Sequence, residues 1–186
     1  MESRAEDIID YARAGKRAKV IAAARVLDST ARGRAAMDLR KGGVPEDRIA
    51  LLAGRATLVK GIARRAEPVR ISLAANQVSA LMPEFYARFA DEVPPEVLKL
   101  DYLDREAELR SLARDKAGVG GATAGLAATW AALRPRVSKI DRRLSLRFAR
   151  HVAAMARLSP SSAALRREAA TGLALVDRLE GAFRGG

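Results

Sequence analysis

The chain contains one histidine and no cysteine, so chemistry that needs an imidazole has a single candidate, His151. The lack of cysteine excludes disulfides, thiolate metal sites and cysteine nucleophiles. His151 follows Arg150 on a predicted helix, with no carboxylate nearby in sequence, and the surrounding cations are expected to lower its pKa. It therefore lacks the acid partner of a serine-type catalytic triad. We predict a non-enzymatic protein without a cofactor.

Basic residues recur at helical spacing between residues 136 and 157. If this segment is one helix, its cations form one stripe and its apolar residues face a core. Rows of guanidiniums can engage successive phosphates or an acidic surface. The alternative interpretation is a solvated helix face in an arginine-biased chain. The candidate anion-binding residues are Arg136, Lys139, Arg142, Arg143, Arg147, Arg150 and Arg157.

Aromatic residues make up only 4% of the chain, which limits how it could bind nucleic acid. Trp130 and Phe148 fall on apolar helix faces, so a stacking platform for single strands is not expected. The sequence also lacks zinc-finger and RNA-recognition motifs. Any contact with nucleic acid would be made through phosphates and would be indifferent to base sequence.

Three acids, Asp101, Asp104 and Glu108, lie on one predicted helix face, where they could hold a hard cation. We favour a solvated or salt-bridged face, because neither EF-hand spacing nor a Glu-x-x-His pair accompanies them. No metal site is predicted. Two ion pairs at four-residue spacing are expected, Asp101 with Arg105 and Glu106 with Arg110.

Two further features of the sequence each admit two interpretations. Asn76 and Gln77, on an apolar helix, are expected to be buried and hydrogen-bonded, or else to line a ligand cavity between two halves together with Tyr102. The glycines of 118–125 faintly resemble a dinucleotide-binding motif, but a helix precedes them where that motif needs a strand. They favour a flexible helix start or a close helix–helix approach.

The pattern that must position these residues is helical from end to end. Apolar residues recur every three or four positions and no alternating strand pattern is present, so we predict an all-α bundle of about seven or eight helices. Pro83 and Pro135 each indicate a kink or a helix start. The expected helices cover 5–14, 17–41, 46–66, 69–90, 95–115, 121–137, 141–158 and 162–183.

The two ends of the chain look related. The stretch 74–78 matches 169–173, and each matched helix closes with phenylalanine, Phe89 and Phe183. This predicts one compact domain with a first half at 1–90, an acidic connecting helix at 91–112 and a second half at 113–186. Each half is expected to contain three related helices.

Three strings carry a family resemblance, namely 93–106, 129–135 and 173–180. With them the chain resembles a loose family of two-repeat, all-helical bacterial proteins that are usually predicted as exported proteins or lipoproteins and have no assigned activity. The resemblance implies the helical fold and the duplication. The chain departs from it in lacking an export signal and in having Thr171 where the first half has Asn76.

The 186 residues carry a formal net charge of +12, which favours acidic or anionic partners. No transmembrane segment is predicted, and the charged N-terminus predicts a cytoplasmic protein unless the sequence is a mature fragment. We predict a binding protein that engages an acidic protein or anionic ligand through its basic arms. The alternative is a sequence-nonspecific nucleic-acid-binding protein that uses the arginines of 136–157. The oligomeric state is left open.

Overall fold

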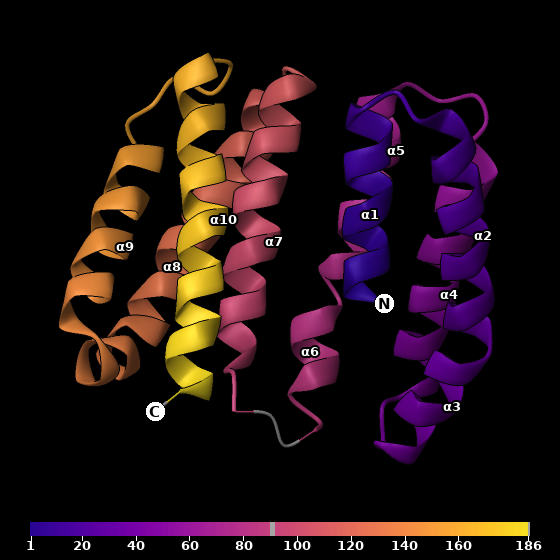
Figure 1. The fold of residues 1–186 in the computed structure, drawn as a ribbon, viewed down its shortest axis with the longest axis horizontal. Coiled ribbons are helices and arrows are strands. Elements are labelled where there is room, and N and C mark those ends of the chain that lie inside the picture. Colours follow the sequence, from indigo (N-terminus) through magenta and orange to yellow (C-terminus); the bar gives the residue numbers. More distant parts are fainter. Residues whose placement is uncertain (90–91, 186) are drawn as a thin grey trace. The chain divides into compact units, whose positions relative to one another are not determined.

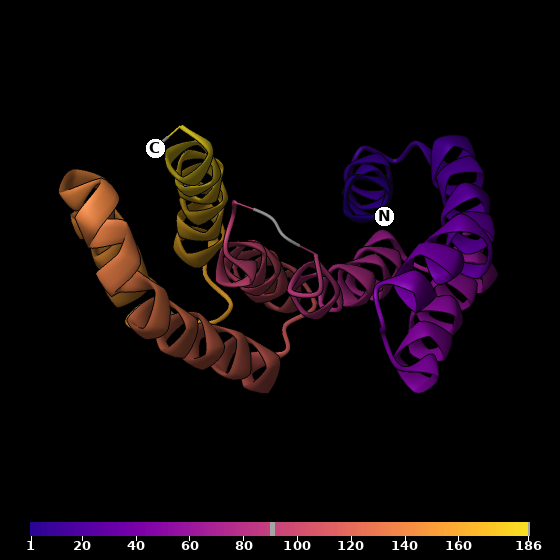
Figure 2. The ribbon, with the colours of Figure 1, turned by 90° about the horizontal axis from the view of Figure 1, so that it is seen from below.

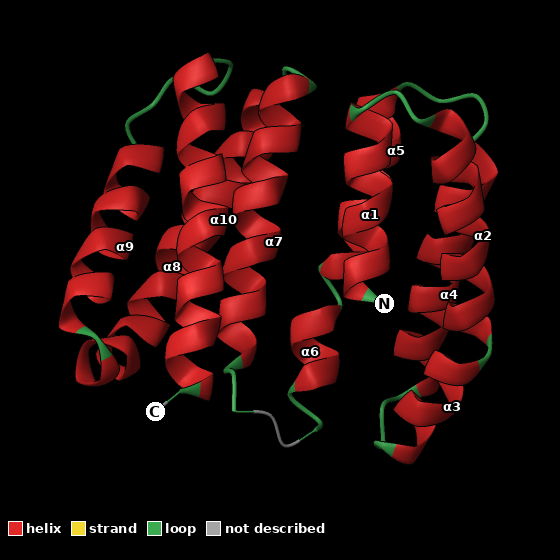
Figure 3. Cartoon of the chain, viewed as in Figure 1, coloured by secondary structure: helices red, strands yellow, loops and turns green. Residues whose placement is uncertain are grey.

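The computed structural model describes residues 1–89 and 92–185, and over these ranges the chain is helical without a strand (Figure 3). The predicted all-α fold is confirmed. The described residues form ten helices, because two of the predicted helices are each divided in two. Residues 90, 91 and 186, which bound several predicted segments, lie outside the described ranges.

The chain divides into two compact units, Met1–Ala90 and Asp91–Gly186. The first unit packs α1 against α2 and α5, and α4 against α2 and α5 (Figure 1). Its core is aliphatic, with Ile8, Leu27 and Leu52 fully buried. Its helices are α1 (Glu2–Arg13), α2 (Arg17–Arg32), α3 (Arg34–Lys41), α4 (Glu46–Ile62), α5 (Pro68–Ser79) and α6 (Met82–Tyr86).

The second unit contains four helices, and these gain most of their stability from packing their apolar faces against one another. Helix α7 packs against α8 and α10, and α9 packs against α8 and α10 (Figure 2). Trp130 and Phe148 lie in its core with ring centroids 4.6 Å apart, as their apolar spacing predicted. The helices are α7 (Pro95–Leu112), α8 (Lys116–Ile140), α9 (Arg142–Met155) and α10 (Ala163–Arg184).

Two predicted helices are interrupted. The segment 17–41 breaks at Gly33, whose φ of −101° and ψ of −107° are not helical. The segment 69–90 ends as α5 at Ser79, and Pro83 then lies in the first turn of the short α6, where a missing N–H costs nothing. Phe89 lies beyond α6 and is 44% exposed, so it does not close a helix as predicted.

The glycine-rich segment is the beginning of α8 and not a boundary before a helix at 121. Asp115 caps α8 by accepting a hydrogen bond from Gly118 N at 2.8 Å, and a Cβ on Gly118 would lie 2.5 Å from that carboxylate. A Cβ on Gly125 would lie 3.0 Å from Leu103 of α7. These two glycines allow a close cap and a close helix–helix approach. Pro135 lies inside α8.

Candidate functional site

A buried histidine between two carboxylates is the main polar feature of the second unit. His151 of α9 places Nε2 at 2.9 Å from Asp104 Oδ1 of α7, and Nδ1 at 2.9 Å from Glu168 Oε1 of α10. The side chains of His151 and Asp104 are 1% and 0% exposed, and that of Glu168 is 27% exposed. The cluster therefore joins three helices and reaches solvent at the Glu168 end.

A glycine leaves space for this cluster, and an aromatic ring packs against it. A Cβ on Gly172 would lie 2.2 Å from Asp104 Oδ2 and 2.5 Å from His151 Nε2, so only glycine fits at this position of α10. The Phe148 ring, one turn before His151, meets the imidazole edge-on with centroids 5.3 Å apart. The imidazole is thus held by packing as well as by its hydrogen bonds.

The electrostatics of this cluster differ from the sequence-based expectation. Burial raises the pKa of Asp104 to about 6, although the hydrogen bond with His151 opposes that change. Burial alone would lower the pKa of His151, but its bonds to Asp104 and Glu168 outweigh burial and raise it. The prediction of a lowered histidine pKa was wrong, because the carboxylates that decide it are distant in sequence. The cluster as a whole retains a proton to higher pH than its separate groups would.

The predicted acidic face of α7 is mostly not solvated. Asp104 is bound to His151, and Glu108 is buried. The expected pairs are confirmed, with Arg105–Asp101 at 3.3 Å and Arg110–Glu106 at 2.8 Å. Within the described ranges, no group of three or more acids and histidines is placed to hold a metal ion.

The candidate anion-binding residues lie near the end of α8, along α9 and in the turn that follows α9. Asp141 ends α8 and caps α9 by accepting a hydrogen bond from Leu144 N at 2.9 Å, so residues 136–157 do not form one continuous helix. Arg136 lies 3.9 Å from Glu96, and Arg150 donates to the Leu146 carbonyl at 3.4 Å. The remaining five are exposed and form no ion pair with a described residue, namely Lys139, Arg142, Arg143, Arg147 and Arg157.

A surface groove of about 330 Å³ lies between the beginning of α9 and the end of α10. Arg143 and Arg147 reach it from α9, and Arg178 reaches it from α10. Sequence reasoning missed Arg178, because helical spacing within 136–157 says nothing about which residue of α10 packs beside α9. The full lining is Asp141, Arg143, Leu144, Arg147, Arg178 and Ala182.

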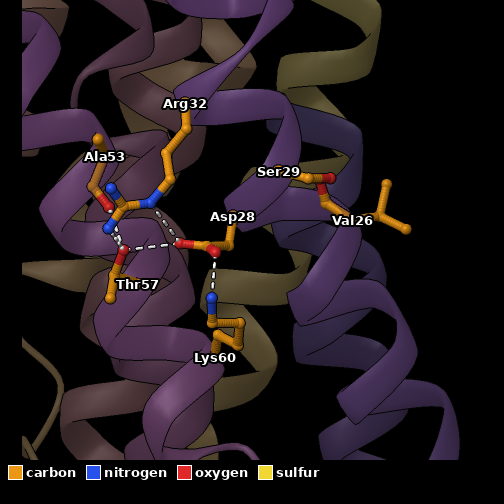
Figure 4. A network of polar contacts seen from close by, with 7 residues as sticks. All are labelled: Val26, Asp28, Ser29, Arg32, Ala53, Thr57 and Lys60. Atoms are coloured by element: carbon orange, nitrogen blue, oxygen red, sulfur yellow. Dashed lines mark hydrogen bonds and ion pairs between the residues drawn. The ribbon is translucent and has the colours of Figure 1, made fainter.

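Several basic residues of the first unit, in contrast, meet acids of the same unit. Asp28 of α2 is 8% exposed and accepts bonds from Lys60 and Thr57 of α4 and from Arg32, as Figure 4 shows. The Lys60 hydrogen bond, followed by that of Thr57, lowers the pKa of Asp28 to about 2. Arg40–Glu46 at 2.6 Å and Arg48–Glu84 continue this pattern.

The residues proposed for a ligand cavity belong to different units. Asn76 is fully buried on α5, and the Gln77 carbonyl next to it accepts a hydrogen bond from Arg55. Tyr102 lies on α7, half-buried against the core of the second unit. A pocket of about 50 Å³ in the first unit is lined by other residues, among them Ala12, Arg17 and Ile71.

The chain matches no protein-family model, and neither a curated protein nor a solved structure shows significant similarity to it. None of the described helices has the length and hydrophobicity needed to cross a membrane. The second unit offers a proton-binding cluster that is mostly buried, and a cationic surface with a groove.

Proposed function

We propose that the protein is a non-enzymatic helical binding protein that engages an acidic protein or an anionic ligand through the second unit. One observation carries the proposal: α9 contains four arginines and no acid, and none of the four forms an ion pair with a described residue. Helix α9 therefore presents its charge to solvent. An acidic partner would attract these four arginines, which no acid in the described part of the unit neutralises.

The first unit contains as many basic residues as the second, but several of its arginines already have partners within the unit. Its arginines at positions 32, 40 and 48 are each held by an acid, and Arg17 donates to the carbonyls of Ala63 and Ala66. Their positive charge is already balanced or committed to holding helices together. The basic arm expected at the beginning of the chain thus contributes less to binding than the one near its end.

The internal duplication is also part of this proposal, with the two compact units as its repeats, so that α7, predicted as a connecting helix between the halves, becomes the first helix of the second repeat. In the first unit α1 and α4 each pack on α2 and α5, and in the second unit α7 and α9 each pack on α8 and α10. The turns after the first helices correspond as well, since Gly15 has a φ of 68° and Arg114 a φ of 58°. Aligning these turns places the buried Ala5 opposite the buried Asp104. The second unit thus has a polar group where the first has a plain core.

The experiment is a titration of the full chain with poly-L-glutamate at low and high salt. Four exposed charge pairs, each contributing a few tenths of a kcal/mol up to about 1 kcal/mol, correspond to tenfold or more in affinity. Changing Arg142, Arg143, Arg147 and Arg150 together to Gln should weaken binding by about that factor and flatten its salt dependence.

The matched control changes four exposed basic residues outside α9 to Gln, namely Arg25, Lys41, Arg64 and Arg65, which removes the same charge from the first unit. Equal losses in both variants would show that net charge alone binds, and would overturn the proposal. A short DNA duplex serves as a second titrant. Tighter binding to the duplex than to poly-L-glutamate at matched charge would favour the nucleic-acid function instead.

A further inference from the structure

We propose that the groove between α9 and α10 binds a phosphoryl group, held by Arg143, Arg147 and Arg178. This inference rests on the proposed function and narrows it to one place and one ligand chemistry. It concerns a site of small-molecule size within the second unit, whereas the general surface of α9 extends beyond it.

Three arginines from two helices line the groove, and this is the first argument. Arg143 and Arg147 are one turn apart on α9, and Arg178 joins them across the groove from α10. All three are exposed, and none is paired with a described residue. Because α9 and α10 are packed together, the three arginines line one groove although their charges repel one another. An anion bound among them would relieve that repulsion.

The chemistry of the donors favours phosphate over a single carboxylate. A guanidinium presents a planar fork of N–H donors that matches two oxygens of a phosphate. A phosphomonoester has three terminal acceptor oxygens and a charge between about −1.5 and −2 at neutral pH. Three arginines can therefore share one phosphoryl group, whereas a carboxylate offers only two oxygens and one charge.

The dimensions and floor of the groove indicate the size of the ligand. Its volume of about 330 Å³ is at the lower end of the range for small-molecule sites, roughly 300–1,000 Å³. Leu144 is buried beneath it and Ala182 is half-buried beside it, so the floor is apolar next to the cations. This suits a phosphate attached to a compact organic group, or one phosphate of a polymer.

Asp141 places one negative charge at the groove, and this provides a test with the opposite sign. Its Oδ1 accepts the Leu144 N–H bond that begins α9, so the carboxylate is needed as a cap and not as a ligand. Asparagine caps helices as well as aspartate does. Asp141→Asn therefore keeps the helix start and removes a repulsive charge, and it should strengthen phosphate binding about threefold to tenfold.

The test is calorimetric titration of the full chain with inorganic pyrophosphate at low salt. We expect one saturable site, with affinity reduced tenfold or more in Arg147→Ala and in Arg178→Ala. Arg147→Lys, which keeps the charge and loses the planar fork, should show an intermediate loss. Arg134→Ala and Arg167→Ala, exposed positions outside the groove, are the controls and should bind as the parent does. Unchanged helical circular dichroism confirms that each variant is folded.

The outcomes separate this inference from the function on which it depends. Pyrophosphate binding that is insensitive to Arg178→Ala overturns the groove, while poly-L-glutamate binding that still depends on α9 leaves the proposed function standing. The groove is also overturned if the α9 variants lose both pyrophosphate and poly-L-glutamate binding while Arg178→Ala changes neither. A phosphorylated small molecule and a DNA duplex, titrated in parallel against Arg178→Ala, distinguish a free phosphate ligand from one carried by a polymer.

Discussion

At the scale of single residues, the cluster around His151 depends on the absence of a Cβ atom at position 172. Gly172 lies on a turn of α10 where a methyl group would overlap Asp104 and His151. The close approach of helix and imidazole is therefore possible only with glycine, at the cost of glycine's weak helix propensity.

Replacing Gly172 by alanine should destabilise the second unit by about 1–3 kcal/mol, because the new Cβ would force Asp104 or His151 from its hydrogen-bonded position. Urea unfolding of the variant measures this. Gly181→Ala is the matched control, since Gly181 is on the same helix and a Cβ there meets nothing within 4 Å. That control should be stabilised by up to about 1 kcal/mol. If both variants shift in the same direction, the packing argument fails.

The sequence predicted residue pairs well when they were one helical turn apart, and poorly otherwise. Asp101 with Arg105 and Glu106 with Arg110 follow from helix geometry alone, and both pairs are present. His151 meets an acid 47 positions away, and that contact depends on how α7, α9 and α10 pack. Local spacing carries no information about such packing.

At the scale of elements, the turns that follow α1 and α7 use the same backbone bonds. Lys16 N donates to Tyr11 O at 2.8 Å, and Asp115 N donates to Arg110 O at 2.9 Å. Both turns need a residue in the left-handed region, which is Gly15 in one and Arg114 in the other. A side chain in that region costs roughly 1–2 kcal/mol, so the second turn is strained and the first is not.

Exchanging the residue types should therefore have opposite effects. Arg114→Gly should stabilise the chain by about 1 kcal/mol, and Gly15→Ala should destabilise it by about the same amount. A Cβ at Gly15 meets no atom within 4 Å, so its effect comes from the backbone alone. Urea midpoints at constant m-value measure both. Equal responses to the two changes would contradict the proposed equivalence of the turns.

Helix type and approximate position were predictable throughout, because amphipathic spacing is a local property. The interruptions were not. Gly33 breaks a segment whose apolar pattern continues through it, and α5 ends before an apolar stretch that sequence reasoning had joined to it. In both places the apolar spacing continues, but a glycine or a proline, which are poor residues for a helix interior, lies at the break or just after it.

At the scale of the whole molecule, the buried titratable groups of the two units have pKa values shifted in opposite directions. The pKa of Asp28 in the first unit is lowered, so its contribution to stability is present above its ordinary pKa of 3.8 and is lost as pH falls toward about 2. In the second unit Asp104 and His151 both have raised pKa values, and burial raises those of Asp101 and Glu180 as well. Their contribution is greatest at low pH and decreases as pH rises.

Between pH 5 and pH 8 the second unit should therefore lose stability while the first changes little. Asp104 becomes costly as pH rises from 3.8 through about 6, and the contribution of His151 is lost above 6.5, through its raised pKa. Backbone hydrogen exchange, corrected for intrinsic rates, measures the opening free energy of each unit. A second unit that is equally or better protected at pH 8 would refute this prediction.

Below pH 4 the first unit should lose stability, as pH falls from 3.8 toward the pKa of Asp28, which is about 2. Asp28→Asn tests this, because it removes the titrating group and should abolish most of the acid loss in that unit. The variant should leave the exchange of the second unit, and its decline toward pH 8, as in the parent. An unchanged acid loss in Asp28→Asn would assign it to other carboxylates.

The chain's single tryptophan lies in only one of its two units. Trp130 is buried there, in contact with the ring that meets His151. Indole emission therefore follows the unfolding of residues 92–185 without any label, while the first unit is silent at that wavelength. A comparison of this emission with the total helical signal would show whether the halves of the molecule melt together or one after the other.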